Sequence, residues 1–89
     1  MDTGDLTNKT YKAIMIEAER FDPNLTLQFG LLSYECKNEK IFIQKSARLI
    51  HEMMTYREEE IDDLFFGSPP TKNEFHKALN KILHNISKL

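Results

Sequence analysis

The fold is decided at the carboxyl end of the chain, where residues 71–89 read TKNEFHKALNKILHNISKL. Thr71 and Glu74 have the spacing of a capping box, in which both side chains accept hydrogen bonds from backbone N–H groups at the start of a helix, and Pro70 can pack on Phe75. The apolar residues of the stretch recur every three or four positions, the period of one helical face: Phe75, Ala78, Leu79, Ile82, Leu83, Ile86 and Leu89. We therefore predict an amphipathic helix of about four turns.

Before this helix, the sequence predicts a stiff connector and a short acidic helix. Residues 67–70, Gly-Ser-Pro-Pro, form the connector, whose glycine suits the left-handed backbone that commonly ends a helix. Thr55 and Glu58 repeat the capping-box spacing, so we predict a helix from there to Phe66. One uninterrupted helix over residues 39–66 is the alternative, because no glycine or proline lies within that range.

A helix with a wide apolar face is predicted to begin at residue 39, with Asn38 as its cap. Its apolar positions fall on two adjacent stripes, one through residues 42, 46, 49 and 53 and the other through residues 43, 47, 50 and 54. A face of this width is typical of a helix that contacts neighbours on two sides. We expect the other helices to pack around it.

The first third of the chain predicts two helices that meet at Asp22 and Pro23. Apolar residues at helical spacing predict the first helix, over residues 7–20: Tyr11, Ile14, Met15, Ala18 and Phe21. Proline disfavours helical geometry in the residue before it, which ends this helix. Aspartate followed by proline is also a favourable way to start the next one.

Residues 24–36 fit two interpretations. The apolar residues at positions 25, 27, 29 and 31 alternate with polar residues or glycine, as in a strand, whereas positions 25, 29, 32 and 36 share one helical face. The start at Asp22 and the lack of a partner strand favour the helix. Gly30 would then lie inside a helix, at a cost of about 1 kcal/mol relative to alanine. We interpret this glycine as a point where another backbone crosses closely.

These elements predict an all-α fold, with one domain over residues 1–89 and four or five helices in an antiparallel bundle or an orthogonal array. The chain has 89 residues, of which 40% are hydrophobic, so it is long enough for one core and too short for two. We expect residues 1–6 to be frayed.

No residue pattern indicates catalysis or a cofactor, and we expect that the protein is not an enzyme. Cys36 is the only cysteine, which excludes an intramolecular disulfide and a zinc site of the multi-cysteine kind. His51, His76 and His84 lack the i, i+4 spacing that places two imidazoles on one metal, so we expect no metal site. The amino-terminal residues show no secretory pattern, and no run approaches the roughly 18 apolar residues of a membrane span. We therefore expect a cytoplasmic protein.

Charge is distributed unevenly along the chain. Residues 1–50 hold seven acids and seven bases, residues 51–70 hold six acids and one base, and residues 71–89 hold one acid and four bases. We interpret the acidic segment as a contact surface for a basic protein partner, in which charge steers the encounter and an aromatic side chain anchors it. The contact residues of this hypothesis are Glu58, Glu59, Glu60, Asp62, Asp63 and Phe66.

An alternative for the same segment is purely structural. Ile61, Leu64 and Phe65 have the i, i+3, i+4 spacing of residues that pack inward together. The carboxylates then serve only to stabilise the first turn of their helix through its macrodipole.

The leading functional hypothesis is a small protein-binding module, a regulator, adaptor or inhibitor of the immunity type, that acts by occlusion or recruitment. A second hypothesis assigns Lys72, Lys77 and Lys81 of the last helix to nucleic-acid contacts. Against it stand the net charge of −2 and the neighbouring acidic segment, which would repel phosphate. A third hypothesis is self-association through surplus apolar surface on the third or the last helix.

Overall fold

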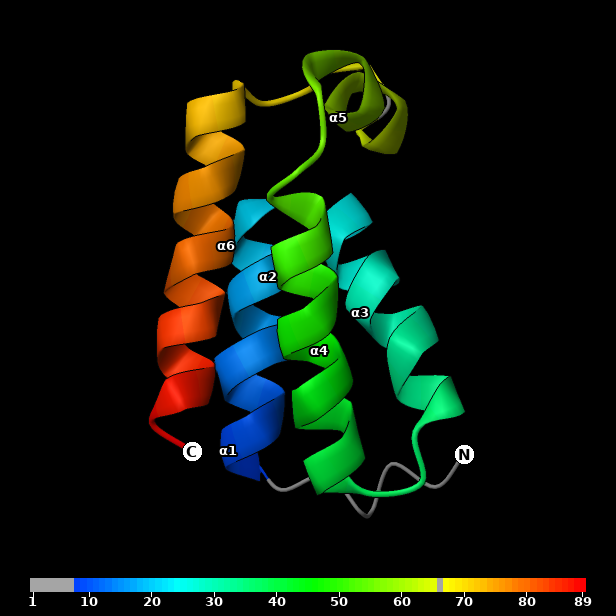
Figure 1. Cartoon of the computed structure of the whole chain (residues 1–89), viewed down its shortest axis with the longest axis vertical. Coiled ribbons are helices and arrows are strands. Elements are labelled where there is room, and N and C mark those ends of the chain that lie inside the picture. The colour runs from blue at the N-terminus through cyan, green and yellow to red at the C-terminus, as the bar shows by residue number, and fades with distance from the viewer. Residues whose placement is uncertain (1–7, 66) are drawn as a thin grey trace.

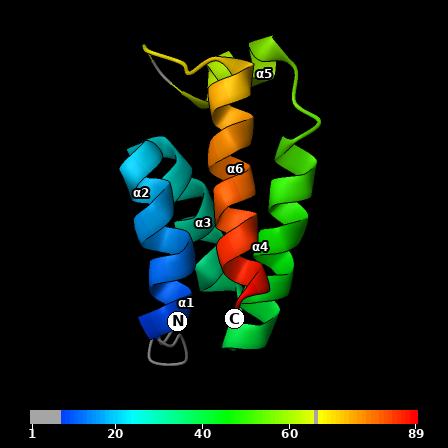
Figure 2. The same ribbon diagram turned by 90° about the vertical axis from the view of Figure 1, so that its left-hand side faces the viewer.

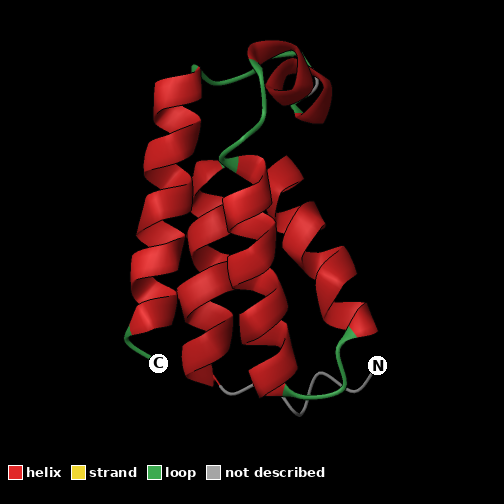
Figure 3. Cartoon of the chain, viewed as in Figure 1, coloured by secondary structure: helices red, strands yellow, loops and turns green. Residues whose placement is uncertain are grey.

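A computed structural model of the protein describes residues 8–65 and 67–89, and every regular element among them is a helix (Figure 3). The predicted all-α class is confirmed, whereas the expected frayed segment, residues 1–6, lies outside the described residues. In chain order the elements are α1 (Asn8–Tyr11), the π-helical turn η2 (Lys12–Ile16), α2 (Glu17–Phe21), α3 (Pro23–Glu35), α4 (Glu39–Met53), α5 (Glu58–Leu64) and α6 (Lys72–Ser87). α1, η2 and α2 follow one another without a break and form the predicted first helix.

The segment that fitted two interpretations is the helix α3, and the strand interpretation is wrong. Its cap is the predicted one, because Asp22 Oδ1 accepts a hydrogen bond of 2.8 Å from the backbone N–H of Asn24. The interpretation of Gly30 as a close backbone crossing is also wrong. A Cβ at this position would lie 3.7 Å from the Cε of Met15, which is an ordinary contact with the end of a flexible side chain.

α4 and α6 also begin at predicted caps. Asn38 Oδ1 accepts a 3.0 Å hydrogen bond from the N–H of Ile41 at the start of α4. At α6 the capping box is complete: the N–H of Glu74 donates to the Thr71 hydroxyl at 3.1 Å, and the N–H of Thr71 donates to the Glu74 carboxylate at 3.0 Å. The pKa of Glu74 is lowered, first by this hydrogen bond from the backbone of Thr71.

The boundary between α4 and α5 corrects two expectations. α4 ends at Met53, so the single helix over residues 39–66 is wrong. The capping box at Thr55 is wrong too, because the hydroxyl of Thr55 donates to the carbonyl oxygen of Glu52 at 2.7 Å and belongs to the end of α4. α5 begins later, where the N–H of Arg57 donates to the Glu60 carboxylate at 2.9 Å.

The four long helical segments alternate in direction and form an up-down-up-down bundle (Figures 1 and 2). The first helix packs against α3 and α6, and α4 packs against the same two neighbours. α4 therefore has neighbours on two sides, as predicted, but so has the first helix, and the core lies between four helices instead of around one. α5 lies across one end of the bundle, and loops join it to the end of α4 and to the start of α6 (Figure 1).

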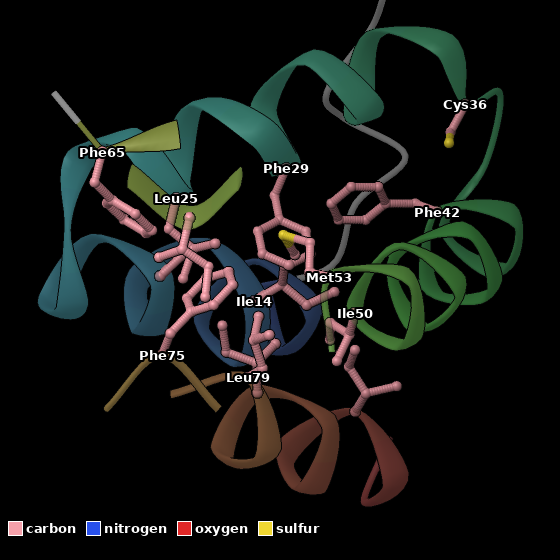
Figure 4. Packing of buried hydrophobic residues seen from close by; sticks show 14 residues of the cluster. Ile14, Leu25, Phe29, Cys36, Phe42, Ile50, Met53, Phe65, Phe75 and Leu79 are labelled. Carbon is pink, nitrogen blue, oxygen red and sulfur yellow. The ribbon is translucent and has the colours of Figure 1, made fainter. Parts of the chain in front are cut away.

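The core draws at least one side chain from each of the long helices and from α5, and Figure 4 shows how these side chains converge. Its aromatic members are Phe29, Phe42, Phe65 and Phe75, each at most 1% exposed. Two residues predicted on inward faces lie outside it, because Tyr11 is 45% and Leu89 is 44% exposed. Gly67 has a φ of +85°, the left-handed geometry predicted at that position. None of the helices in the described part of the chain has the length and hydropathy to cross a lipid bilayer.

Candidate protein-binding surfaces

α5 is held on the end of the bundle by apolar side chains of its inner face. Ile61 and Phe65 are each 1% exposed. The Phe65 ring meets the rings of Phe21 and Phe75 edge-on, with centroids 5.9 Å and 5.3 Å apart. Such edge-to-face pairs add about 0.5–1.5 kcal/mol each beyond the burial of area. Ile61 and Phe65 therefore pack inward, and Phe65 is not available to anchor a partner.

The outer face of α5 carries the predicted acidic residues, and all five are exposed: Glu58, Glu59, Glu60, Asp62 and Asp63. Arg57 lies beside them, with its guanidinium 3.8 Å from the Glu59 carboxylate, but both side chains are at least 75% exposed. An ion pair so exposed contributes little and leaves most of the negative charge unbalanced. Phe66, the aromatic contact of the hypothesis, lies outside the described residues. The structure thus places the five carboxylates of the hypothesis on one short helix, whereas its aromatic contact, Phe66, is not among the described residues.

The basic residues of α6 are exposed, but they do not form an uninterrupted basic surface. Lys81 Nζ lies 3.0 Å from the Glu17 carboxylate of α2, which also pairs with Arg20 at 3.5 Å. Lys72 shares a shallow hollow with Glu58 and Asp62 at the opposite end. Lys77 lies close enough to the Glu74 carboxylate to help lower the pKa of that group. Acidic groups therefore lie near all three lysines that the nucleic-acid hypothesis names.

A surface that the sequence interpretation missed lies on the outer side of α3. Leu27, Leu31 and Tyr34 are 56%, 55% and 70% exposed. Their i, i+4, i+7 spacing places them on one face of the helix. We call these three residues the α3 stripe.

The surroundings of the α3 stripe set it apart from the rest of the surface. No residue from Pro23 to Tyr34 is charged. The outer faces of the other long helices all bear exposed charged side chains, among them Lys12, Lys45 and Lys77. No large apolar side chain within α4 or α6 is exposed, so the surplus apolar surface is not on the helices that the self-association hypothesis named.

The sequence did contain a signal for the stripe. Once the inward face of α3 is taken to be Leu25, Phe29 and Ser33, the apolar residues left over also recur at helical spacing. A helix with apolar residues on two opposite faces is typical of a helix that is covered on both faces. In the described chain, α3 is covered on one side only, at the edge of the bundle (Figure 1).

The remaining chemically active side chains do not converge. Among the described residues, no three His, Cys, Asp or Glu side chains are grouped closely enough to hold a metal ion. His51 and His84 are exposed on different helices, and Nε2 of His76 is buried without a hydrogen-bond partner in the described chain. Cys36 is 3% exposed, and burial raises the pKa of its thiol, which donates to the carbonyl oxygen of Leu32 at 3.2 Å.

Comparison of the chain with protein-family models, with curated proteins and with solved structures gives no match.

Proposed function

We propose that this protein is a small protein-binding module that acts by occlusion or recruitment, as a regulator, adaptor or inhibitor, and that the α3 stripe is its contact surface. The observation that carries the proposal is the exposure of Leu27, Leu31 and Tyr34 on one uncharged helical face. Exposed apolar side chains that gather on one face mark interaction sites more often than scattered ones do.

The composition of the stripe supports a protein as the ligand. Tyrosine is enriched among the residues that dominate binding energy at interfaces, and charged residues are depleted from interface centres. Tyr34 is the most exposed large apolar side chain of the described residues, at 70%, so it has most surface to lose on binding. A backbone already fixed in a helix also lowers the entropy that binding would cost.

The acidic face of α5 supplies a second, separate surface on which a basic partner could be steered. Its five carboxylates are exposed and held on a helix that Ile61 and Phe65 fix in place. Because α5 offers no fully exposed apolar side chain among the described residues, this face contributes to the rate of encounter more than to the lifetime of a complex. This acidic face would favour a basic partner, but the proposal does not depend on it.

The test is a capture experiment with matched bait proteins. The baits are the wild type, Leu31→Glu on the stripe and Gln44→Glu on the exposed face of α4, which adds the same charge elsewhere. A protein retained from cell extract by the wild type and by Gln44→Glu, and lost with Leu31→Glu, is the expected result. Retention that is equal with all three baits contradicts the assignment of the stripe.

A further inference from the structure

We infer that the α3 stripe binds a second copy of this chain, so that two molecules pair through antiparallel α3 helices. The inference rests on the proposed function and names the occupant of its surface. It starts from the absence of charge. When a two-fold axis brings a surface against itself, every charge meets a like charge near the axis, and such contacts are destabilising. The outer face of α3 avoids this cost near the axis, since no residue from Pro23 to Tyr34 is charged and the exposed Glu35 lies at the end of the helix.

The spacing of the stripe suits an antiparallel pair. An axis that passes between Gly30 and Leu31 sets Leu27 of one copy against Tyr34 of the other, and the two Leu31 side chains next to each other. The stripe then covers itself completely, with each large side chain opposite another.

The ends of α3 also bear on the direction of pairing. The helix ends at the exposed Glu35 and is followed by Lys37, and Asp22 caps its amino end. Antiparallel pairing brings Lys37 of each copy toward Asp22 of the other, with Glu35 farther from that carboxylate, and it sets the two helix dipoles in opposite directions. Parallel pairing would instead place Lys37 beside Lys37, Glu35 beside Glu35 and Asp22 beside Asp22, with the two dipoles in the same direction. The dipoles and the end charges therefore favour the antiparallel arrangement.

The other described residues leave this side of α3 open. α3 lies at the edge of the bundle, opposite α6, because both pack against the first helix and α4 (Figures 1 and 2). A second copy on α3 therefore leaves the lysines of α6 uncovered. A helix of 13 residues is about 20 Å long, so the contact is small and the dimer is expected to be weak.

The first measurement is sedimentation equilibrium of purified protein over about 1 μM to about 1 mM, the range in which a weak interface is populated. We expect the mass of the wild type to rise toward twice the monomer mass, and the mass of Gln44→Glu to rise in the same way. Leu31→Glu should stay a monomer, because it sets two carboxylates together at the axis. A wild type that is monomeric throughout, or a Leu31→Glu variant that still dimerises, overturns the inference.

The second measurement tests the register by disulfide crosslinking, in a Cys36→Ala background that removes the native thiol. We expect Leu31→Cys to crosslink readily under mild oxidation, because residue 31 lies next to its own copy across the axis. Leu27→Cys should crosslink poorly with itself, since the two copies of residue 27 are about 10 Å apart along the helices. A mixture of Leu27→Cys and Tyr34→Cys should restore the crosslink. Equal crosslinking of Leu27→Cys and Leu31→Cys overturns the antiparallel arrangement.

These experiments separate the inference from the proposed function. If the purified wild type stays monomeric while the capture of another protein still depends on Leu31, the second copy is the wrong occupant and the proposed function stands. If the wild type dimerises and nothing else is captured, the stripe is a dimer surface alone. If neither binding is seen, both are wrong.

Discussion

Gly30 shows how a single residue can weaken a helix without serving its packing. It lies in the middle of α3 with ordinary backbone geometry, and an added Cβ would meet only the end of the Met15 side chain, 3.7 Å away. Gly30→Ala should therefore raise the free energy of unfolding by about 0.5–1 kcal/mol, because alanine loses less backbone entropy in a helix. Urea unfolding at low micromolar protein concentration measures this change.

Gly67 provides the matched control, since the same substitution should act in the opposite direction there. Its φ of +85° is a conformation that residues with a Cβ rarely adopt, although nothing lies within 4 Å of the added atom. Gly67→Ala should lower the free energy of unfolding by about 1–2 kcal/mol. A loss of stability in Gly30→Ala would instead restore the close backbone crossing that the sequence suggested.

The role of a single residue can be predicted from the sequence when its hydrogen-bond partner is close to it along the chain. Asp22, Asn38 and Thr71 were assigned as caps correctly, because each accepts a hydrogen bond from a backbone N–H at most three residues away. Thr10 is fully buried and was not expected to be. Its hydroxyl donates to the carboxylate of Glu39, 29 residues along the chain, and a pattern read within one helix contains no information about that contact.

At the scale of an element, α5 depends on Phe65. Truncation to alanine removes a ring that is 1% exposed and that contacts Phe21 and Phe75, so Phe65→Ala should cost about 3 kcal/mol of stability. Hydrogen exchange should show the amides of α5 losing protection before those of α6. Asp63→Ala, on the exposed face of α5, is the control and should change stability by less than about 0.5 kcal/mol.

A second variant keeps this prediction testable if Phe65→Ala does not fold. Phe65→Leu retains most of the apolar volume and should cost about 1 kcal/mol, with the same order of protection loss. If either variant leaves the amides of α5 protected as in the wild type, α5 does not depend on this ring.

The presence of each helix was predicted more accurately than the residues at which it ends or the face that it exposes. Periodicity assigned the first helix, α4 and α6, because each buries one regular stripe. The break between Met53 and Glu58 was placed too early, since the Thr55 hydroxyl can serve the end of one helix as well as the start of the next. The α3 stripe was missed because periodicity shows that two faces are apolar and leaves open which of them the other helices cover.

On the scale of the whole molecule, two modes of self-association are possible, and they differ in symmetry and in their response to salt. The acidic segment, net −5 over residues 51–70, and the basic last helix, net +3 over residues 71–89, could attract each other between molecules. Such a contact joins two different surfaces, so it would continue into chains unless the rotation between copies closes a ring. The α3 stripe joins identical surfaces and stops at two copies.

Ionic strength separates the two modes. Raising sodium chloride from about 50 mM to about 500 mM shortens the Debye length from more than about 10 Å to about 4 Å and screens exposed charges. A dimer held by Leu27, Leu31 and Tyr34 should change its dissociation constant by less than about threefold, because its charged contacts lie at the ends of α3, where the exposed Glu35 and Lys37 side chains contribute little. Charge reversal on α5, with Glu58, Glu59, Asp62 and Asp63 changed to lysine, should leave the dimer mass unchanged at both salt concentrations. A dimer that dissociates in high salt, or assemblies larger than two that disappear with the reversed charges, would place the contact between α5 and α6 and not on α3.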